Sequence, residues 1–153
     1  METYDKAKAA RVWQRVQAEA APADPTQGLL GLIAEEWADA ALYLALSRRV
    51  QGNAANILRK MGQEEQAHMA CLKGIYTLQG TGRPDVPPPP PLEKAPVITL
   101  LRRCYGREMR CLAKYEARAT HPEYGQIFAR MAQQEREHCR LLLELMGSLP
   151  REK

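Results

Sequence analysis

Aromatic residues are scarce in this chain, and residues that favour helix take their place. Only 6% of the 153 residues are aromatic, runs of β-branched residues are few, and Ala, Leu, Arg, Gln and Glu dominate. These five residue types have high helix propensity. A chain of this length forms about one domain and can bury a sizeable core. The composition therefore predicts a single all-α domain.

Cysteine pairs of the Cys-x-x-Cys type are absent. The four cysteines are Cys71, Cys104, Cys111 and Cys139. Their spacing excludes a zinc ribbon and a rubredoxin-type iron site, both of which need paired cysteines. All four stand beside apolar residues in stretches that favour helix, and nothing marks them as ligands. We therefore expect small, buried, reduced thiols, as is usual in cytoplasmic proteins.

Long apolar runs, a signal-peptide pattern and a nucleic-acid recognition motif are also missing. The most apolar stretch, residues 28–46, carries Glu35, Glu36 and Asp39, whereas a membrane-spanning helix needs about 20 apolar residues. The net charge is only +4, and the Lys and Arg residues are scattered. We therefore expect a cytoplasmic protein with no membrane and no nucleic acid among its partners.

The N-terminal segment, residues 1–27, is predicted to form a short amphipathic helix and a linker. The helix spans residues 4–20 and places Val12, Trp13 and Val16 on one side. Two prolines in the linker break it before the next helix begins. We expect this short helix to cover the rest of the protein or a partner subunit.

Residues 28–149 are predicted to form a bundle of four long helices. A Gly52-Asn53 turn joins the first two helices and a turn at residues 121–125 joins the last two, and turns this short make antiparallel neighbours. Gly52 suits the left-handed position after a helix, and Asn53 suits the N-cap of the next. The predicted helices span residues 28–51, 54–79, 96–119 and 126–146.

One long linker, residues 80–95, separates the two helix pairs. It contains Gly80, Gly82 and the proline run 87–91. Prolines forbid helix and favour a stiff extended chain that rises about 3.1 Å per residue. Roughly 16 such residues can run the ~40 Å length of a long helix. We therefore interpret the linker as the long crossover of a helix bundle, with a proline-rich ligand for SH3-like domains as the alternative.

Two Glu-x-x-His motifs, Glu65 to His68 and Glu135 to His138, use two of the three histidines. Positions i and i+3 share one face of a helix. Both glutamates stand among apolar neighbours, and a lone buried carboxylate must be protonated, paired or bound to metal. The motifs therefore indicate a metal site inside the bundle. His121 falls in a predicted turn, and we interpret it as a surface histidine.

The other two long helices each carry a Glu-x6-Tyr motif, Glu36 to Tyr43 and Glu108 to Tyr115. Seven residues make two turns, so each hydroxyl lies on the face of its carboxylate. Counted from the tight turns, these glutamates lie within roughly 5 Å in height of those in the Glu-x-x-His motifs. We interpret the tyrosines as hydrogen-bond donors that hold the carboxylates bridging the metals.

Joining the two hairpins brings four carboxylates and two imidazoles together in the middle of the bundle. This donor set suits two divalent ions and favours iron or manganese over copper or structural zinc. Glu35 and Glu64 are the alternatives to Glu36 and Glu65, because both have some apolar neighbours and Glu64 stands four residues before His68. The predicted metal ligands are Glu36, Glu65, His68, Glu108, Glu135 and His138.

Over residues 28–147 these four motifs resemble the ferritin-like superfamily, and most closely its rubrerythrin-like branch. The resemblance implies a ferritin-like antiparallel four-helix bundle with one long crossover and, here, a short extra N-terminal helix. It implies a di-iron centre held by the six residues above, with Tyr43 and Tyr115 hydrogen-bonded behind them. It also implies a cytoplasmic homodimer that reduces hydrogen peroxide or dioxygen.

Many rubrerythrins carry a rubredoxin-type domain whose iron is held by paired Cys-x-x-Cys motifs, and those motifs are missing here. Electrons for a peroxidase would therefore come from a separate donor such as a rubredoxin-like protein. Two alternatives remain. One is a non-catalytic protein that binds or handles iron, and the other is a dimanganese protein with catalase-like activity.

Overall fold

The computed structural model describes residues 6–20, 25–80 and 82–150. Within these residues the chain forms helices and no strand, so the predicted all-α class is confirmed. Residues 21–24 of the predicted linker, which ran to residue 27, and residues 4 and 5 of the predicted short helix lie outside the described residues. The helices are α1 (Lys6–Ala20), α2 (Pro25–Ser47), α3 (Gly52–Leu78), α4 (Val97–Arg118) and α5 (Gly125–Ser148).

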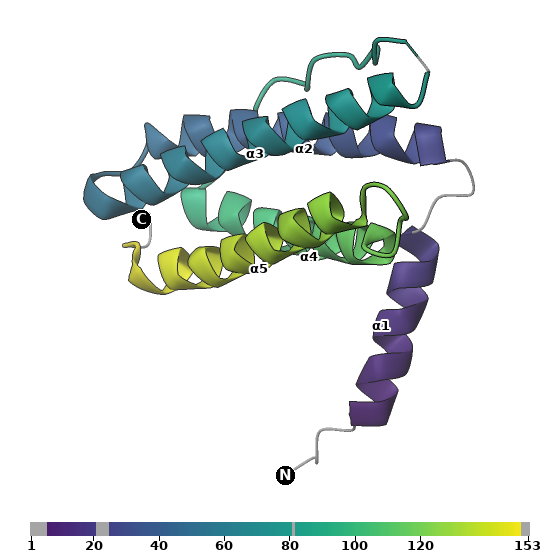
Figure 1. Ribbon diagram of the computed structural model, residues 1–153. Coiled ribbons are helices and arrows are strands. Elements are labelled where there is room, and N and C mark those ends of the chain that lie inside the picture. The colour runs from purple at the N-terminus through teal and green to yellow at the C-terminus, as the bar shows by residue number, and fades with distance from the viewer. Residues whose placement is uncertain (1–5, 21–24, 81, 151–153) are drawn as a thin grey trace.

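Four of these helices form two antiparallel hairpins that face each other (Figure 1). Helix α2 packs along α3, and α4 packs along α5. The hairpins meet where α3 approaches α5 and where α2 approaches α4. Because the long connection returns the chain before α4 starts, α4 runs antiparallel to α2 (Figure 1). In the described part of the chain, none of the helices combines the length and the apolar character needed to cross a membrane.

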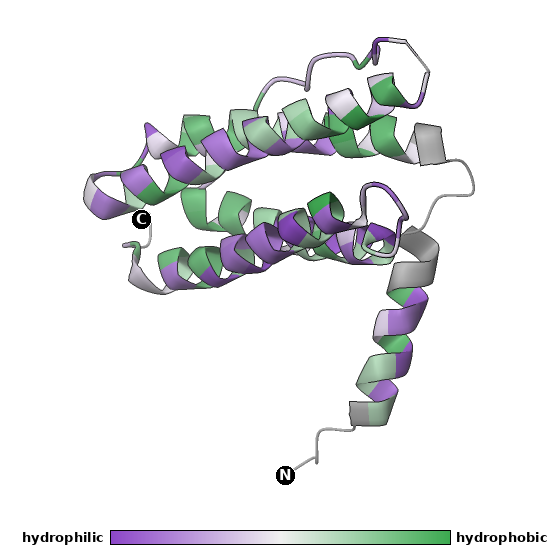
Figure 2. Cartoon of the chain, in the orientation of Figure 1, coloured by the Kyte–Doolittle hydropathy of each residue, from purple (hydrophilic) through white to green (hydrophobic). Residues whose placement is uncertain are grey.

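The interior of the hairpin pair consists of two apolar layers with a polar layer between them. One apolar layer contains Leu32, Leu72 and Phe128, and the other contains Leu46 and Leu142. On α3 and α5 hydrophilic residues take up much of the surface, interspersed with hydrophobic ones (Figure 2). The apolar layers therefore seal both ends of a buried polar band. The buried polar residues in that band are Glu36, Asp39, Glu65, His68, Glu108, Glu135 and His138.

Helix boundaries differ from the sequence prediction at several places. Helix α2 begins at Pro25, so residues 25–27, predicted as linker, are helical. Helix α2 ends at Ser47, because the next two backbone N–H groups bond to carbonyls three residues back and tighten the last turn. Gly52 is left-handed as predicted, with φ +62°, but it begins α3, so the N-cap is Gln51 rather than Asn53. Helix α5 continues through Gly147 instead of ending before it.

Residues 82–96 have no helix or strand and connect the end of α3 to the start of α4. Val86 packs against the apolar layer that contains Leu32, and Leu92 lines a surface hollow with Leu46, so this stretch lies along α2. The connection therefore runs the length of the bundle, as the polyproline rise predicted. It also explains why α2 is apolar on most of its faces, because α2 lies beneath the connection as well as against α3.

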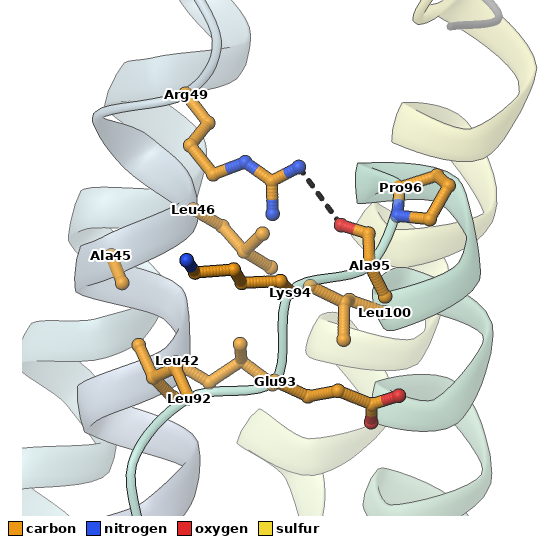
Figure 3. A pocket seen from close by; sticks show the side chains of 10 residues that line it. All are labelled: Leu42, Ala45, Leu46, Arg49, Leu92, Glu93, Lys94, Ala95, Pro96 and Leu100. Atoms are coloured by element: carbon orange, nitrogen blue, oxygen red, sulfur yellow. Dashed lines mark hydrogen bonds between the residues drawn. The ribbon is translucent and has the colours of Figure 1, made fainter.

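The end of this connection is fixed to the turn that joins α2 to α3. The Arg49 guanidinium donates a hydrogen bond of 2.8 Å to the carbonyl oxygen of Ala95 (Figure 3). Pro96 follows as the N-cap residue of α4. The contact joins residues far apart in the sequence and sets where the second hairpin begins.

Helix α1 contacts α4 and extends away from the two hairpins (Figure 1). The Trp13 indole donates a 3.2 Å hydrogen bond to Glu116, and its ring packs at the edge of the apolar layer. Val12 is 52% exposed, so the predicted apolar side of α1 is only partly covered within the described residues. Glu116 also forms an ion pair with Arg136 of α5, which ties α1 to both helices of the second hairpin.

Candidate metal centre

The six predicted metal ligands all lie in the polar band, and each is at most 3% exposed. Helices α2 and α4 each contribute one glutamate, and α3 and α5 each contribute one Glu-x-x-His pair. The i, i+3 spacing turns both members of a pair towards the opposite hairpin, because these positions lie one turn apart on one face. The structure therefore places the six residues together. Their binding of metal remains a prediction.

The six residues form two overlapping groups, each of which could hold a metal ion. In each group the potential ligand atoms lie within 4.8 Å of one another. Glu65 and Glu135 belong to both groups, whereas neither group contains Glu35 or Glu64. Two adjacent positions that share two carboxylates are the arrangement expected for a bridged metal pair. One group is Glu36, Glu65, His68 and Glu135, and the other is Glu65, Glu108, Glu135 and His138.

Both histidines direct Nδ1 into the cluster. His68 Nδ1 lies 3.1 Å from Oε2 of Glu65 and 2.9 Å from Oε1 of Glu135. His138 Nδ1 lies 2.8 Å from Oε1 of Glu65. Each imidazole therefore approaches a carboxylate of the opposite hairpin, and the Nδ1 atoms are the ones placed to bind an ion.

The outer nitrogens of the same two rings are hydrogen-bonded across the hairpins. His68 Nε2 donates to Oε1 of Gln134 at 2.7 Å, and His138 Nε2 donates to Oε2 of Glu64 at 2.7 Å. Each bond keeps a proton on Nε2 and leaves Nδ1 free as a donor to metal. Sequence reasoning missed Gln134, and it paired Glu64 with His68 of its own helix. The available signal was that both residues directly precede the glutamate of a Glu-x-x-His motif.

The tyrosines also bond across the hairpins. The Tyr43 hydroxyl donates to Oε1 of Glu108, and the Tyr115 hydroxyl donates to Oε1 of Glu36. Each tyrosine thus bonds to a predicted ligand of the opposite hairpin, and Glu36 and Glu108 each belong to one group only. Because α2 and α4 run antiparallel, the tyrosine two turns beyond one glutamate lies level with the glutamate of the other helix.

Burial and crowding of charge keep protons in this cluster when no metal is bound. Burial, together with the nearby Glu65 charge, raises the pKa of Glu36 to about 8. Burial and neighbouring carboxylates raise the pKa of Glu135 well above its ordinary value. Burial alone would lower the pKa of His68, but hydrogen bonds to Glu36 and Glu65 raise it to about 11. Protons thus supply the positive charge that a cation would otherwise bring.

Several inward atoms of the cluster lack a well-directed hydrogen bond, and a bound cation would satisfy them. Within the described residues, Glu65 Oε1, Glu108 Oε2, Glu135 Oε1 and His138 Nδ1 are buried without a well-directed hydrogen bond. Leaving one such group unsatisfied costs about 1–3 kcal/mol. Oxygen and imidazole donors of this kind suit iron and manganese alike. The residues present therefore fit a pair of divalent ions.

Two ion pairs flank the cluster between α2 and α4. Asp39, which is 2% exposed, pairs with Arg107. Lys114 Nζ contacts the two carboxylate oxygens of Glu35 at 2.8 and 3.0 Å, and Cys111 donates to the same carboxylate at 3.5 Å. Glu35 thus points to the side of the cluster, which explains why Glu36 and not Glu35 lies in the metal-binding group.

The remaining predicted residues have structural surroundings. Cys71 is exposed, so its predicted burial is wrong; it lies at the edge of the buried face of α3. Burial raises the pKa of the Cys104 thiol to about 12 and that of Cys139 to about 11, which keeps both protonated. His121 does more than occupy a surface turn, because its Nδ1 accepts the backbone N–H groups of Glu123 and Tyr124 at 3.1 Å.

No family model, no curated protein and no solved structure matches this chain. Only its own sequence and structure therefore describe its class. The chain is an all-α protein whose buried glutamate and histidine groups could hold a metal ion.

Proposed function

We propose that this chain is a rubrerythrin-like di-iron carboxylate oxidoreductase that reduces hydrogen peroxide or dioxygen. One observation carries the proposal: the two overlapping ligand groups share Glu65 and Glu135. A shared pair of carboxylates holds two ions close together, whereas a structural site for one ion would need only one group. Electrons come from a separate donor, such as a rubredoxin-like protein.

The arrangement of the helices supports a ferritin-like four-helix bundle. Two antiparallel hairpins, a connection along the length of α2 and a short helix before the first hairpin match the architecture expected from the motifs (Figure 1). In bundles of this type, one glutamate comes from each of two helices and a Glu-x-x-His pair from each of the other two. The chain's free thiols suit the cytoplasmic setting that we propose.

Each of the six predicted ligands has a defined task in this proposal. Glu65 and Glu135 would contribute to both ion positions, while the remaining glutamate and histidine of each group would complete one position. Tyr43 and Tyr115 hold the non-bridging carboxylates, and the apolar layers exclude water. A bound metal pair would supply Lewis acidity and two electrons, which together with two protons reduce one hydrogen peroxide molecule to two water molecules.

The proposal is tested on protein purified without oxygen and loaded with ferrous iron. We expect about two irons per chain and a near-ultraviolet band that forms on oxidation by peroxide. Continued peroxide consumption should require an added electron donor. Failure to bind metal after anaerobic reconstitution would overturn the proposed centre, and slow oxidation despite a competent donor would favour an iron-handling protein without turnover.

The donor set gives one further candidate, a dimanganese centre with catalase-like activity. Four carboxylates and two imidazoles can also hold manganese, so the donor set alone does not select iron. The two functions differ in their need for a reductant. Oxygen release from peroxide by the manganese-loaded protein, with no donor added, would establish the catalase-like alternative.

We also propose that the protein is a homodimer in which α1 docks on the partner subunit. Val12 is 52% exposed, and α1 extends away from its own hairpins (Figure 1). An amphipathic helix with an exposed apolar residue can bury that residue against a second copy. Sedimentation of the wild type and of Val12→Asp tests this: the wild type should sediment as a dimer and the variant as a monomer.

A further inference from the structure

The two histidines of the cluster have hydrogen-bond acceptors of different charge. Both bonds start at Nε2, both measure 2.7 Å, and both cross between α3 and α5. The acceptor for His68 is the neutral amide oxygen of Gln134, whereas the acceptor for His138 is the carboxylate of Glu64. Both acceptors directly precede the glutamate of a Glu-x-x-His motif, so they occupy matching places in the two hairpins.

The remaining ligands of the two positions are alike. Each position has one histidine Nδ1, the two shared carboxylates and one further glutamate. That further glutamate accepts a tyrosine hydroxyl in both cases, from Tyr115 to Glu36 and from Tyr43 to Glu108. The acceptors at the outer nitrogens are therefore the clearest chemical difference in the hydrogen bonds to the ligands of the two positions.

Resting on the metal centre proposed above, we propose that Glu64 and Gln134 are positioning residues that make the two metal positions unequal. The position formed with Glu108 and His138 binds its ion more tightly than the position formed with Glu36 and His68. A carboxylate attracts the Nε2 proton more strongly than an amide oxygen does, because the bond is charge-assisted. The ring then carries more electron density at Nδ1 and is the stronger metal ligand.

The surroundings of the two acceptors make them suitable for substitution. The Glu64 side chain is 27% exposed, and Lys60 Nζ lies 3.8 Å from its Oε1. Gln134 borders a surface hollow beside Arg130 and Arg136. Glutamate and glutamine have the same length and shape. Exchanging one for the other therefore changes the charge of the acceptor and leaves the hydrogen-bond geometry available.

The first experiment measures each position separately with Co²⁺, which is stable to oxidation in air and has visible absorption bands. Glu36→Ala leaves the position with His138, and Glu108→Ala leaves the position with His68. Calorimetric titration should show that Glu36→Ala binds Co²⁺ about 10- to 100-fold more tightly than Glu108→Ala does. This is the range over which mutation of an outer hydrogen-bond partner changes metal affinity. Equal affinities would overturn the inference.

The second experiment keeps every ligand and changes only the acceptors. The wild type should bind two Co²⁺ ions in two resolved steps, and Glu64→Gln should bring the two affinities together. The double swap, Glu64→Gln with Gln134→Glu, has unchanged net charge and should separate them again, with the tighter ion now at the His68 position. Glu137→Gln is the matched control, because Glu137 is exposed and pairs with Arg140.

The outcomes separate the inference from the proposed function. Two Co²⁺ ions bound with affinities that Glu64→Gln leaves unchanged would overturn the inequality and keep the two-ion centre. A wild type that binds no Co²⁺ would overturn both. A spectrum of the doubly swapped protein in which the two steps exchange their absorption bands would establish that the outer acceptors order the two positions.

Discussion

The hairpin of α2 and α3 and the hairpin of α4 and α5 have the same interior but different surroundings. Each supplies two buried glutamates and a histidine to the polar band, and a tyrosine of an apolar layer that bonds to a glutamate of the band. Outside this set they diverge: Glu64 in one hairpin corresponds to Gln134 in the other, and Asp39 to Cys111. The repeated part contains the groups that face the cluster. Chemistry therefore constrains the inward positions, while the outward positions are free to make the two halves unequal.

The two ion pairs between α2 and α4 differ in how far their carboxylates are exposed to water. Asp39 is buried and depends on Arg107 to compensate its charge. The Glu35 side chain is 38% exposed, so both water and Lys114 stabilise its charge. Removing the partner of a buried charge lowers the free energy of unfolding far more than removing the partner of a solvated charge. The same kind of contact thus has different weight on the two sides of the cluster.

The largest effect is expected from removing a carboxylate that belongs to both ligand groups. Replacement of Glu65 or Glu135 by Ala removes a ligand from both groups and should abolish binding of both ions together with activity. Glu36→Ala or Glu108→Ala removes a ligand from one group and should leave about one ion per chain. Metal analysis of anaerobically loaded protein measures this.

Glu137→Ala is the control for these variants, since Glu137 is exposed and contacts Arg140 on the outer face of α5. It should retain its full metal content. Full retention of metal in both Glu65→Ala and Glu135→Ala would show that the shared carboxylates are not the bridge.

Metal removal should make stability depend on pH. The folded pKa of Glu36 is raised from 4.5 to about 8, and that of His68 from 6.5 to about 11. Between pH 5 and 8 the folded, metal-free state therefore holds more protons than the unfolded state. Its free energy of unfolding should fall as pH rises, by at most about 1.4 kcal/mol per pH unit for each such group.

Denaturant unfolding at pH 5.5 and pH 8 measures this dependence in both forms. The metal-loaded protein should lose less stability over the same range, because bound ions replace the protons. Glu108 does not reverse the trend, since its pKa is lowered and its contribution is lost only in acid. A metal-free protein that is more stable at pH 8 would contradict the charge balance described for the cluster.

The two ion pairs between α2 and α4 give the third prediction. Arg107→Ala leaves Asp39 buried without its partner and should lower the free energy of unfolding by about 2–3 kcal/mol. Lys114→Ala removes a partner from the solvated Glu35 and should cost less than about 1 kcal/mol. Chemical denaturation compares the two, and similar losses for both variants would mean that burial of Asp39 does not set the difference.

The hydroxyls should affect metal binding less than the ligands themselves do. Tyr43→Phe should weaken metal binding about tenfold, through Glu108 of the opposite hairpin. A double-mutant cycle of Tyr43→Phe with Glu108→Gln should show coupling of about 0.5–1.4 kcal/mol, and one with Glu36→Gln should be additive. Metal titration supplies the affinities. Coupling to Glu36 instead would mean that Tyr43 bonds to the glutamate of its own helix and not to Glu108.

Much of the fold follows from local signals in the sequence. The left-handed Gly52 and the prolines between residues 82 and 96 place the breaks between helices, because they restrict the backbone directly. Cys71 shows the limit of such signals. Apolar neighbours in sequence predicted its burial, yet it lies at the edge of the buried face of α3, where small rotations of the helix decide exposure.

By itself the sequence determined which six residues form the two ligand groups, since a period of 3.6 residues places Glu65 and His68 on one face whatever that face meets. Only the tertiary structure decided the partners. Tyr43 bonds to Glu108, and His138 bonds to Glu64, because α2 runs antiparallel to α4 and α3 lies beside α5. Those contacts join residues more than 60 positions apart. Helical periodicity carries no information about the relative height of two helices, which packing and the length of the connection set.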